Sequence, residues 1–167
     1  IYYKKESGVT SEREVEIAYE VGSMIDVDYS KLSDKILKNF WYVNHTKDAK
    51  KKITDEEWED YSLRKLDDDD IQNMIFDRIT EEDLAIYDEE DKEASYIYYL
   101  MNKGYSYAEK VIKNVDVTDS EYALISENID TLSGVNTKLD WNRIYLYGDT
   151  FKSILGSVSS SSQGIPS

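Results

Sequence analysis

The chain has 167 residues, the length of one domain, and carries 20 lysines and arginines against 35 aspartates and glutamates. Its formal net charge of −15 disfavours a nucleic-acid backbone or an anionic lipid surface as a partner. Hydrophobic residues make up 40% of the chain and aromatic residues 13%. We therefore expect a folded acidic domain and not a disordered segment.

The sequence contains no cysteine, which excludes disulfides, thiolate metal sites and cysteine nucleophiles. Its longest apolar run, residues 97–101, is far shorter than the roughly 20 residues that a membrane span needs. The start at Ile1 lacks a methionine and a signal-peptide apolar region, and it has the pattern of a strand. These features predict a piece of a longer protein.

Capping boxes predict four helix starts. In a capping box, a hydroxyl side chain and an acid three residues later each accept a hydrogen bond from the other's backbone N–H. The pairs are Ser11 with Glu14, Thr54 with Glu57, Thr80 with Asp83 and Thr118 with Glu121. After Ser11, one helical face carries the apolar positions Val15, Ala18, Tyr19, Gly22 and Ile25.

Further helices are expected in the middle of the chain. One begins near Ser30 and buries Leu32, Ile36, Leu37 and Phe40, and another surrounds Trp58. The four aspartates 67–70 favour a helix start over a helix interior, so we expect a break there. From Thr80 the pattern predicts one long helix to Met101, followed by Gly104 at a positive φ angle.

The last third of the chain mixes strands and helices. We expect a strand at residues 110–113, a helix from Thr118 to Leu132, a strand over 138–147 and a short helix from Thr150 to Leu155, ended by Gly156. Residues 157–167 have the composition of a serine-rich connector. Strands at both ends of the chain that pair with each other give an α+β fold.

Catalytic patterns are weak in this sequence. His45 is the only histidine and lies in a polar, turn-like segment, which is typical of a surface residue. Ser62 and Lys65 match S-x-x-K, and residues 126–128 match S-x-N, but the K-[ST]-G element that completes a penicillin-reactive site is absent. The acidic clusters do not have the spacing of a calcium loop. We expect them to be solvated helix faces.

Tyrosine is unusually frequent, with 15 residues. Several of these tyrosines lie in apolar surroundings, where a ring packs while its hydroxyl reaches water. Two interpretations stay open, namely packing in the core and a wide surface for protein interactions.

One family resemblance is specific. The C-terminal third carries, in order, an acid, a turn with Gly134-Val135, the segment 141–151, a short helix ending in glycine and a Gly-Ile-Pro turn at 164–166. This order and spacing resembles the non-catalytic N-terminal module of class B penicillin-binding proteins, especially those of Gram-positive bacteria. Ser133 and Leu146 stand where the family usually has proline.

The resemblance implies a role for particular residues. It marks as structural or interface positions Glu127, Gly134, Arg143, Tyr145, Gly148, Gly156 and Gly164. Arg143 matches the arginine of the family's R-x-Y motif, which implies an ion pair within the module. The resemblance implies no catalytic residue, cofactor or metal in this chain.

The resemblance also implies an architecture and a set of partners. We expect a small mixed sheet platform, residues 1–10 and 105–167, that carries a helical acidic head, residues 11–104. The whole protein would be a membrane-anchored peptidoglycan D,D-transpeptidase, with this module outside the cytoplasm as a pedestal or dimerisation domain. The expected partners are its own transpeptidase domain, membrane proteins of cell-wall synthesis in elongation or division, and a second copy of the chain.

Two other functions are compatible with the sequence. The first is a stand-alone acidic inhibitor or binding domain whose carboxylates mask a basic partner. Salt would weaken that binding steeply, but would affect contacts through tyrosine-rich surfaces little. The second is a small carboxylate-dependent hydrolase, which is disfavoured because no acid pair lies in an apolar setting that would raise its pKa.

Overall fold

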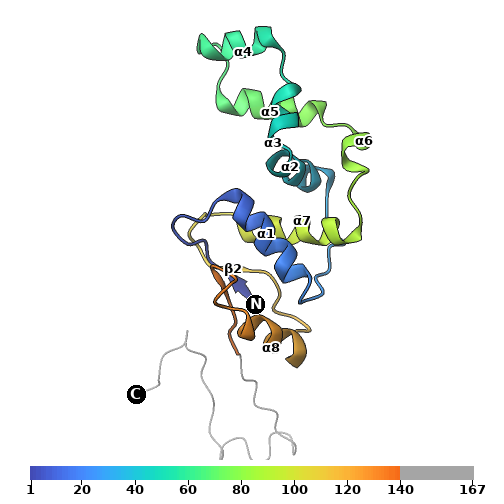
Figure 1. The fold of residues 1–167 in the computed structure, drawn as a ribbon, viewed down its shortest axis with the longest axis vertical. Coiled ribbons are helices and arrows are strands. Elements are labelled where there is room, and N and C mark those ends of the chain that lie inside the picture. The colour runs from blue at the N-terminus through green and yellow to red at the C-terminus, as the bar shows by residue number, and fades with distance from the viewer. Residues whose placement is uncertain (140–167) are drawn as a thin grey trace, which may run out of the picture. The chain divides into compact units, whose positions relative to one another are not determined.

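The computed structural model of the chain describes residues 1–139. The first part consists of β1 (Tyr2–Tyr3), α1 (Ser11–Gly22), α2 (Asp34–Asn44), α3 (Thr46–Lys51), α4 (Asp55–Ser62) and α5 (Asp68–Arg78) (Figure 1). The second part consists of α6 (Glu81–Leu84), α7 (Glu89–Asn102), β2 (Lys110–Val111), α8 (Asp119–Glu127) and β3 (Val135–Asn136). Within residues 1–139, no helix is long and apolar enough to cross a membrane.

A small sheet joins segments from both ends of the described chain. Its strand order is β2-β1-β3, so the first strand is the central one. Tyr2 of β1 faces Val111 of β2 on one side and Asn136 of β3 on the other, and both pairings are antiparallel. The helices and this sheet confirm the α+β class. The sheet was predicted to be mixed, but its two pairings within residues 1–139 are antiparallel.

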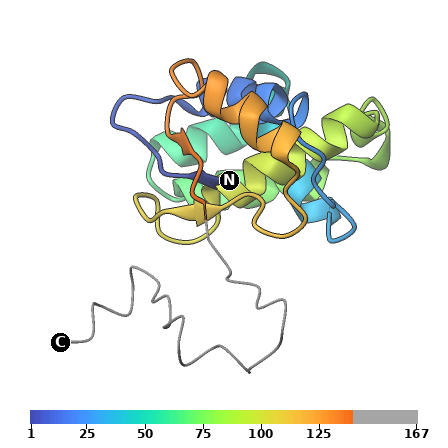
Figure 2. The ribbon, with the colours of Figure 1, turned by 90° about the horizontal axis from the view of Figure 1, so that it is seen from below.

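Helices α1 and α7 form the layer between the sheet and helices α2 to α6, whereas α8 lies on the side of the sheet (Figure 1). Ile17 and Val21 of α1, and Ile97 and Met101 of α7, are fully buried, which fits the contact between these two helices. Gly22 lies so close to α7 that a Cβ atom there would be 3.4 Å from Cδ1 of Ile97. Seen from below in Figure 2, α8 and β1 are in front, and the helices lie behind them.

An aromatic cluster joins α2 to this layer. The ring of Phe40 is fully buried, and its centroid lies 5.9 Å from that of Tyr19, 5.8 Å from that of Tyr87 and 5.7 Å from that of Tyr98. These tyrosines therefore belong to the core. Tyr105 and Tyr107, by contrast, are 76% and 59% exposed, so core packing does not account for every tyrosine, and a surface for protein interactions stays a prediction.

Most of the predicted caps are present. The capping boxes at Thr54, Thr80 and Thr118 are confirmed. The predicted box at Ser11 is wrong, because Thr10 is the N-cap of α1 and accepts a hydrogen bond from the backbone N–H of Arg13. Asp67 caps α5, as the four aspartates indicated, and Asp88 forms a further box at the start of α7.

Several predicted element bounds are wrong. The helix expected from Thr80 to Met101 is interrupted between α6 and α7, because Asp88 caps a new helix and Tyr87 turns into the core. Helix α2 begins at Asp34, helix α8 ends at Glu127, and β3 was not predicted. Gly104 has the expected positive φ angle of 77°. The elements expected beyond residue 139 lie outside the described residues.

Candidate functional site: the clamped sheet

The sheet and the two helices that hold it, α1 and α8, form the candidate site. From here on we call this unit the platform, so the platform now includes α1, whose residues the sequence assigned to the head. Its first fixed point is Gly134, in the turn before β3. The backbone N–H of Lys4 donates a hydrogen bond of 2.8 Å to the carbonyl oxygen of Gly134. Gly134 has a φ angle of 83°, and a Cβ atom there would lie 2.4 Å from the carbonyl oxygen of Lys4. Both conditions require glycine.

Glu14 clamps β1 to α1 from inside the protein. Its carboxylate is 1% exposed and accepts hydrogen bonds from the hydroxyl of Tyr3, at 2.8 Å, and from Nζ of Lys5, at 2.7 Å. Burial and the bond to Glu14 raise the pKa of Tyr3 well above its ordinary value, so this phenol stays a donor. A buried carboxylate with two donors fixes the strand to the helix.

Glu121 forms the second clamp, at the start of α8. One carboxylate oxygen accepts hydrogen bonds from Nζ of Lys113 at 2.7 Å and from the backbone N–H of Asp26 at 3.0 Å. The other accepts from the backbone N–H of Thr118 at 2.8 Å. Burial alone would raise the pKa of Glu121, but these bonds outweigh it and lower the pKa to about 2. The clamp joins α8, the segment after β2 and the loop after α1.

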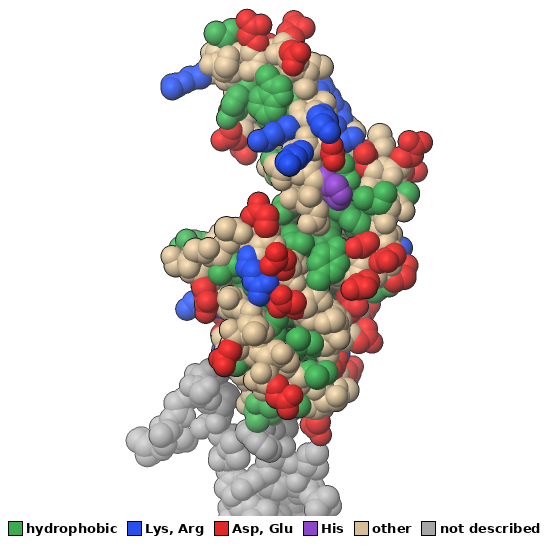
Figure 3. Space-filling model, in the orientation of Figure 1, with side chains coloured by type: hydrophobic (Ala, Val, Ile, Leu, Met, Phe, Trp, Pro, Cys, Tyr) green, Lys and Arg blue, Asp and Glu red, His purple; other side chains and the backbone are tan. Residues whose placement is uncertain are grey.

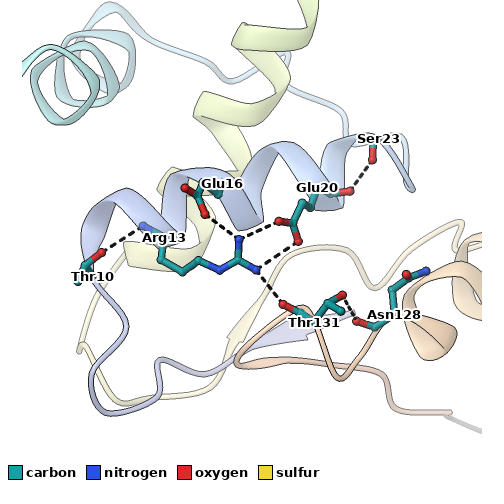
Figure 4. Close-up of polar contacts among 7 residues, drawn as sticks. All are labelled: Thr10, Arg13, Glu16, Glu20, Ser23, Asn128 and Thr131. Atoms are coloured by element: carbon teal, nitrogen blue, oxygen red, sulfur yellow. Dashed lines mark hydrogen bonds and ion pairs between the residues drawn. The ribbon is translucent and has the colours of Figure 1, made fainter.

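Arg13 forms the third clamp, from α1 to the loop after α8 (Figure 4). Its guanidinium donates to Glu16 and Glu20 on the same helix, each at 2.8 Å, and to the carbonyl oxygen of Thr131, also at 2.8 Å. The hydroxyl of Thr131 donates in turn to the carbonyl oxygen of Asn128 at 2.8 Å. The two carboxylates hold the guanidinium so that it faces the loop.

A similar set of contacts holds the helical head. Nζ of Lys52 donates to Asp83 at 2.6 Å and lies 5.2 Å from the ring centroid of Trp41. Arg78 makes two hydrogen bonds to the carboxylate of Glu57, at 2.7 and 2.6 Å, and these lower the pKa of Glu57 to about 2. Charge-assisted contacts therefore link the short helices of the head, in addition to buried apolar residues such as Ile53 and Ile75.

The residues that suggested catalysis are engaged in local contacts. The hydroxyl of Ser62 donates to the carbonyl oxygen of Glu59, and Lys65 pairs with Asp60 at 2.7 Å, so the two do not form a Ser–Lys dyad. His45 is half-buried and stacks on Trp41, which corrects the expectation of a plain surface residue. Within residues 1–139, no group of acids and histidines is placed to hold a metal ion.

Comparison with known proteins decides the family. The chain matches the family described as the penicillin-binding protein dimerisation domain over residues 4–164. Penicillin-binding protein 2A of Bacillus subtilis (strain 168) is 36% identical over 167 residues, which make up 100% of this chain and 23% of that protein. The chain belongs to the penicillin-binding protein dimerisation domain family.

Two further relatives agree with this assignment. Penicillin-binding protein H of Bacillus subtilis (strain 168) is 24% identical over 194 residues, 99% of this chain and 27% of that protein. The solved structure of penicillin-binding protein 2B from Streptococcus pneumoniae (strain 5204) shares the fold, with a TM-score of 0.61 and 21% identity over 99% of this chain and 25% of that one. This dimerisation domain thus spans about a quarter of the length of its relatives.

The structure places two of the seven residues that the family resemblance marked. Gly134 lies in the platform against β1, whereas Glu127 is exposed at the last position of α8. The other five, Arg143, Tyr145, Gly148, Gly156 and Gly164, lie outside the described residues. The interface role of all seven stays a prediction, and so does the division into platform and head.

Sequence reasoning missed the clamps of this dimerisation domain. Glu14 was interpreted as a capping acid, although it precedes Ala18 by four residues and Val21 by seven and therefore lies on the apolar face of α1. A charged residue on an apolar helical face is a signal that could have identified it. The contacts of Arg13 with Thr131 and of Lys113 with the carbonyl oxygen of Asp26 had no comparable signal, because the partners are 118 and 87 positions apart.

Proposed function

We propose that this dimerisation domain is the non-catalytic pedestal of a membrane-anchored peptidoglycan D,D-transpeptidase, a class B penicillin-binding protein, with the domain outside the cytoplasm. It positions the transpeptidase domain and contacts proteins of cell-wall synthesis, and a second copy of the chain is a further partner. The observation that carries the proposal is the clamped platform, in which Glu14, Glu121 and Arg13 tie strands to helices. Such clamps suit a rigid support. Family membership favours this role over a stand-alone acidic inhibitor.

The proposal predicts that loosening the platform impairs the work of the whole protein but leaves its penicillin chemistry intact. In the longer protein, we expect Arg13→Gln combined with Glu121→Gln to lower peptidoglycan cross-linking in cells severalfold. The purified protein should still be acylated by fluorescent penicillin at an unchanged rate, because its catalytic domain stays folded. A matched control is Arg64→Gln with Glu82→Gln, since both side chains are exposed and the same charges are removed.

The same labelling tests the absence of catalysis in this chain. The isolated chain should acquire no fluorescent penicillin, while the longer protein should be labelled. Covalent labelling of the isolated chain that Ser62→Ala abolishes would contradict the pedestal role. Equal cross-linking in the platform variant and in its control would contradict the positioning role.

A further inference from the structure

A groove of about 840 Å³ lies between α2, α5 and α7. Figure 1 shows these three helices in the head and in the layer below it. The walls are fixed to each other, because Nζ of Lys38 on α2 donates to the carbonyl oxygen of Phe76 on α5 at 2.8 Å. Tyr42 packs edge-on against Phe76 with ring centroids 5.8 Å apart. The groove is separate from the clamps of the platform.

The charge of the groove is opposite to that of the chain. Lys31, Lys35 and Lys103 line it, and no aspartate or glutamate is among the residues that form its lining. This is unexpected in a protein with 35 acidic residues. Acidic side chains are scattered over the face that Figure 3 shows. Within residues 1–139, Lys35 and Lys103 make no ion pair, and Lys31 contributes only a weak attraction that helps to lower the pKa of Asp28.

Aromatic rings provide the apolar part of the groove. Tyr96 and Tyr99 project from α7 with ring centroids 5.9 Å apart and an interplanar angle of 32°. Tyr96 is 9% exposed and Tyr99 is 38% exposed, and both line the groove, so the buried ring of Tyr96 supports the more exposed ring of Tyr99. A tyrosine that is rigid and partly exposed is the type of side chain that anchors protein interfaces.

Amide side chains complete the lining. Asn39, Gln72 and Asn73 each offer donors and an acceptor, which match the alternating N–H and C=O groups of an extended peptide. The lysines supply positive point charges for carboxylates, and the tyrosine rings and amides supply contacts for the neighbouring peptide.

We propose that the groove binds an extended segment of a partner protein that carries two or three carboxylates next to an aromatic or apolar side chain. The net charge of −15 repels a partner that is acidic overall, so the segment belongs to a partner of low net charge. At physiological salt, charges more than about 8 Å apart are largely screened. Once the segment is in the groove, its attraction to the nearby lysines therefore outweighs its repulsion by distant carboxylates. The inference rests on the proposed function only in that a pedestal has protein partners.

The test uses a decapeptide with three glutamates, two tyrosines and five glycine or serine residues, labelled with a fluorophore that carries no net charge, and measures its fluorescence anisotropy with the chain. We expect saturable binding that weakens at least tenfold in Lys31→Gln with Lys35→Gln. The matched control is Lys47→Gln with Lys50→Gln, which removes two exposed lysines of α3 and should leave binding unchanged. Tyr99→Ala should weaken binding severalfold with the same dependence on salt. The side-chain amide signals of Asn39, Gln72 and Asn73 should shift in NMR spectra.

Four outcomes would overturn the proposal. The first is no binding of the glutamate peptide at about 1 mM, and the second is equal binding of a peptide with glutamine in place of every glutamate. The third is an equal loss in the α3 control, which would indicate non-specific attraction to lysines. The fourth is binding of an oligogalacturonate but not of the peptide, which would assign the groove to an acidic glycan. None of these outcomes affects the cross-linking test of the pedestal role.

Discussion

At the scale of single residues, two carboxylates within residues 1–139 are buried. Glu14 and Glu121 are 1% and 9% exposed, whereas the acidic clusters of the helix starts are mostly exposed. Each accepts hydrogen bonds from a lysine and from a second element of the chain. For Glu121, the ionised form is the one that the fold requires, because Lys113, Asp26 and Thr118 all donate to it.

This requirement predicts a stability that depends on pH. The folded pKa of Glu121, about 2, lies below its unfolded value, so its contribution is fully present above about pH 5 and is lost as the pH falls towards 2. At pH 7 we expect Glu121→Gln to lower the free energy of unfolding by about 1–3 kcal/mol. The difference from the wild type should be much smaller at pH 3, as measured by urea unfolding.

Glu127→Gln provides the control for this prediction, because Glu127 is exposed at the other end of α8. Its unfolding free energy should equal that of the wild type at both pH values. A cost of Glu121→Gln that stays the same from pH 7 to pH 3 would contradict the role of the ionised carboxylate.

Residue-scale prediction succeeded where the requirement is local. Gly134 could be predicted as a turn residue, and its close approach to Lys4 gives the physical reason. The capping role assigned to Glu14 was wrong, because spacing alone does not show that Tyr3 and Lys5 return to the same side chain. The link from Arg13 to Thr131 spans 118 positions in the sequence and leaves no trace in either local segment.

At the scale of elements, the boundaries follow from capping chemistry. The boxes at Thr54, Thr80 and Thr118 could be predicted, since both partners lie within four residues. The box of Asp88 with Asp91 was missed, because an aspartate in an acidic run also fits a helix surface. The missed cap explains why one long helix was predicted where α6 and α7 are separate. Each strand has two residues, too few to show the alternation of apolar and polar residues that predicts a strand.

The two aspartate caps should differ in their effect on stability. Asp88 starts α7, the helix that packs on both α1 and α2, and its box partner Asp91 also accepts a hydrogen bond from Tyr19 at 2.6 Å. We expect Asp88→Ala to lower the global free energy of unfolding by about 1 kcal/mol. Asp67→Ala should mainly increase amide hydrogen exchange in α5. Equal global losses for both variants would contradict this ranking.

At the scale of the whole molecule, the net charge opposes folding. With −15 charges, carboxylates repel one another over the surface, and the ion pairs within residues 1–139 offset only part of this repulsion. Salt screens the distant repulsions most, because the Debye length falls from about 30 Å at 0.01 M to about 10 Å at 0.1 M. The buried clamps are affected much less.

We therefore expect the thermal midpoint to rise by a few degrees between 0.01 and 0.1 M NaCl. Glu59→Lys, an exposed position on α4, should raise the midpoint at low salt and reduce its dependence on salt. A midpoint that falls with added NaCl would show that attractive surface ion pairs outweigh the repulsion.

The sequence alone allowed the α+β class and a helical middle to be predicted, because periodicity and caps act locally. The strand order could not be predicted, since β3 has two residues and no pattern of its own. The groove between α2, α5 and α7 was missed for a similar reason. Its three lysines lie on two segments that only the packing of α7 brings together.

The central position of β1 has a consequence for the order of events during synthesis. Within residues 1–139, β1 is synthesised before both strands that flank it: the carbonyl oxygen of Ile1 accepts a hydrogen bond from the backbone N–H of Lys113, and β3 follows later still. Tyr3 is completely buried in the folded chain, but its strand stays unpaired while helices α1 to α7 are synthesised. The sheet can therefore close only after β3 has emerged, and closing it joins segments that are more than 100 residues apart. Until then, the apolar residues of β1 are accessible to chaperones.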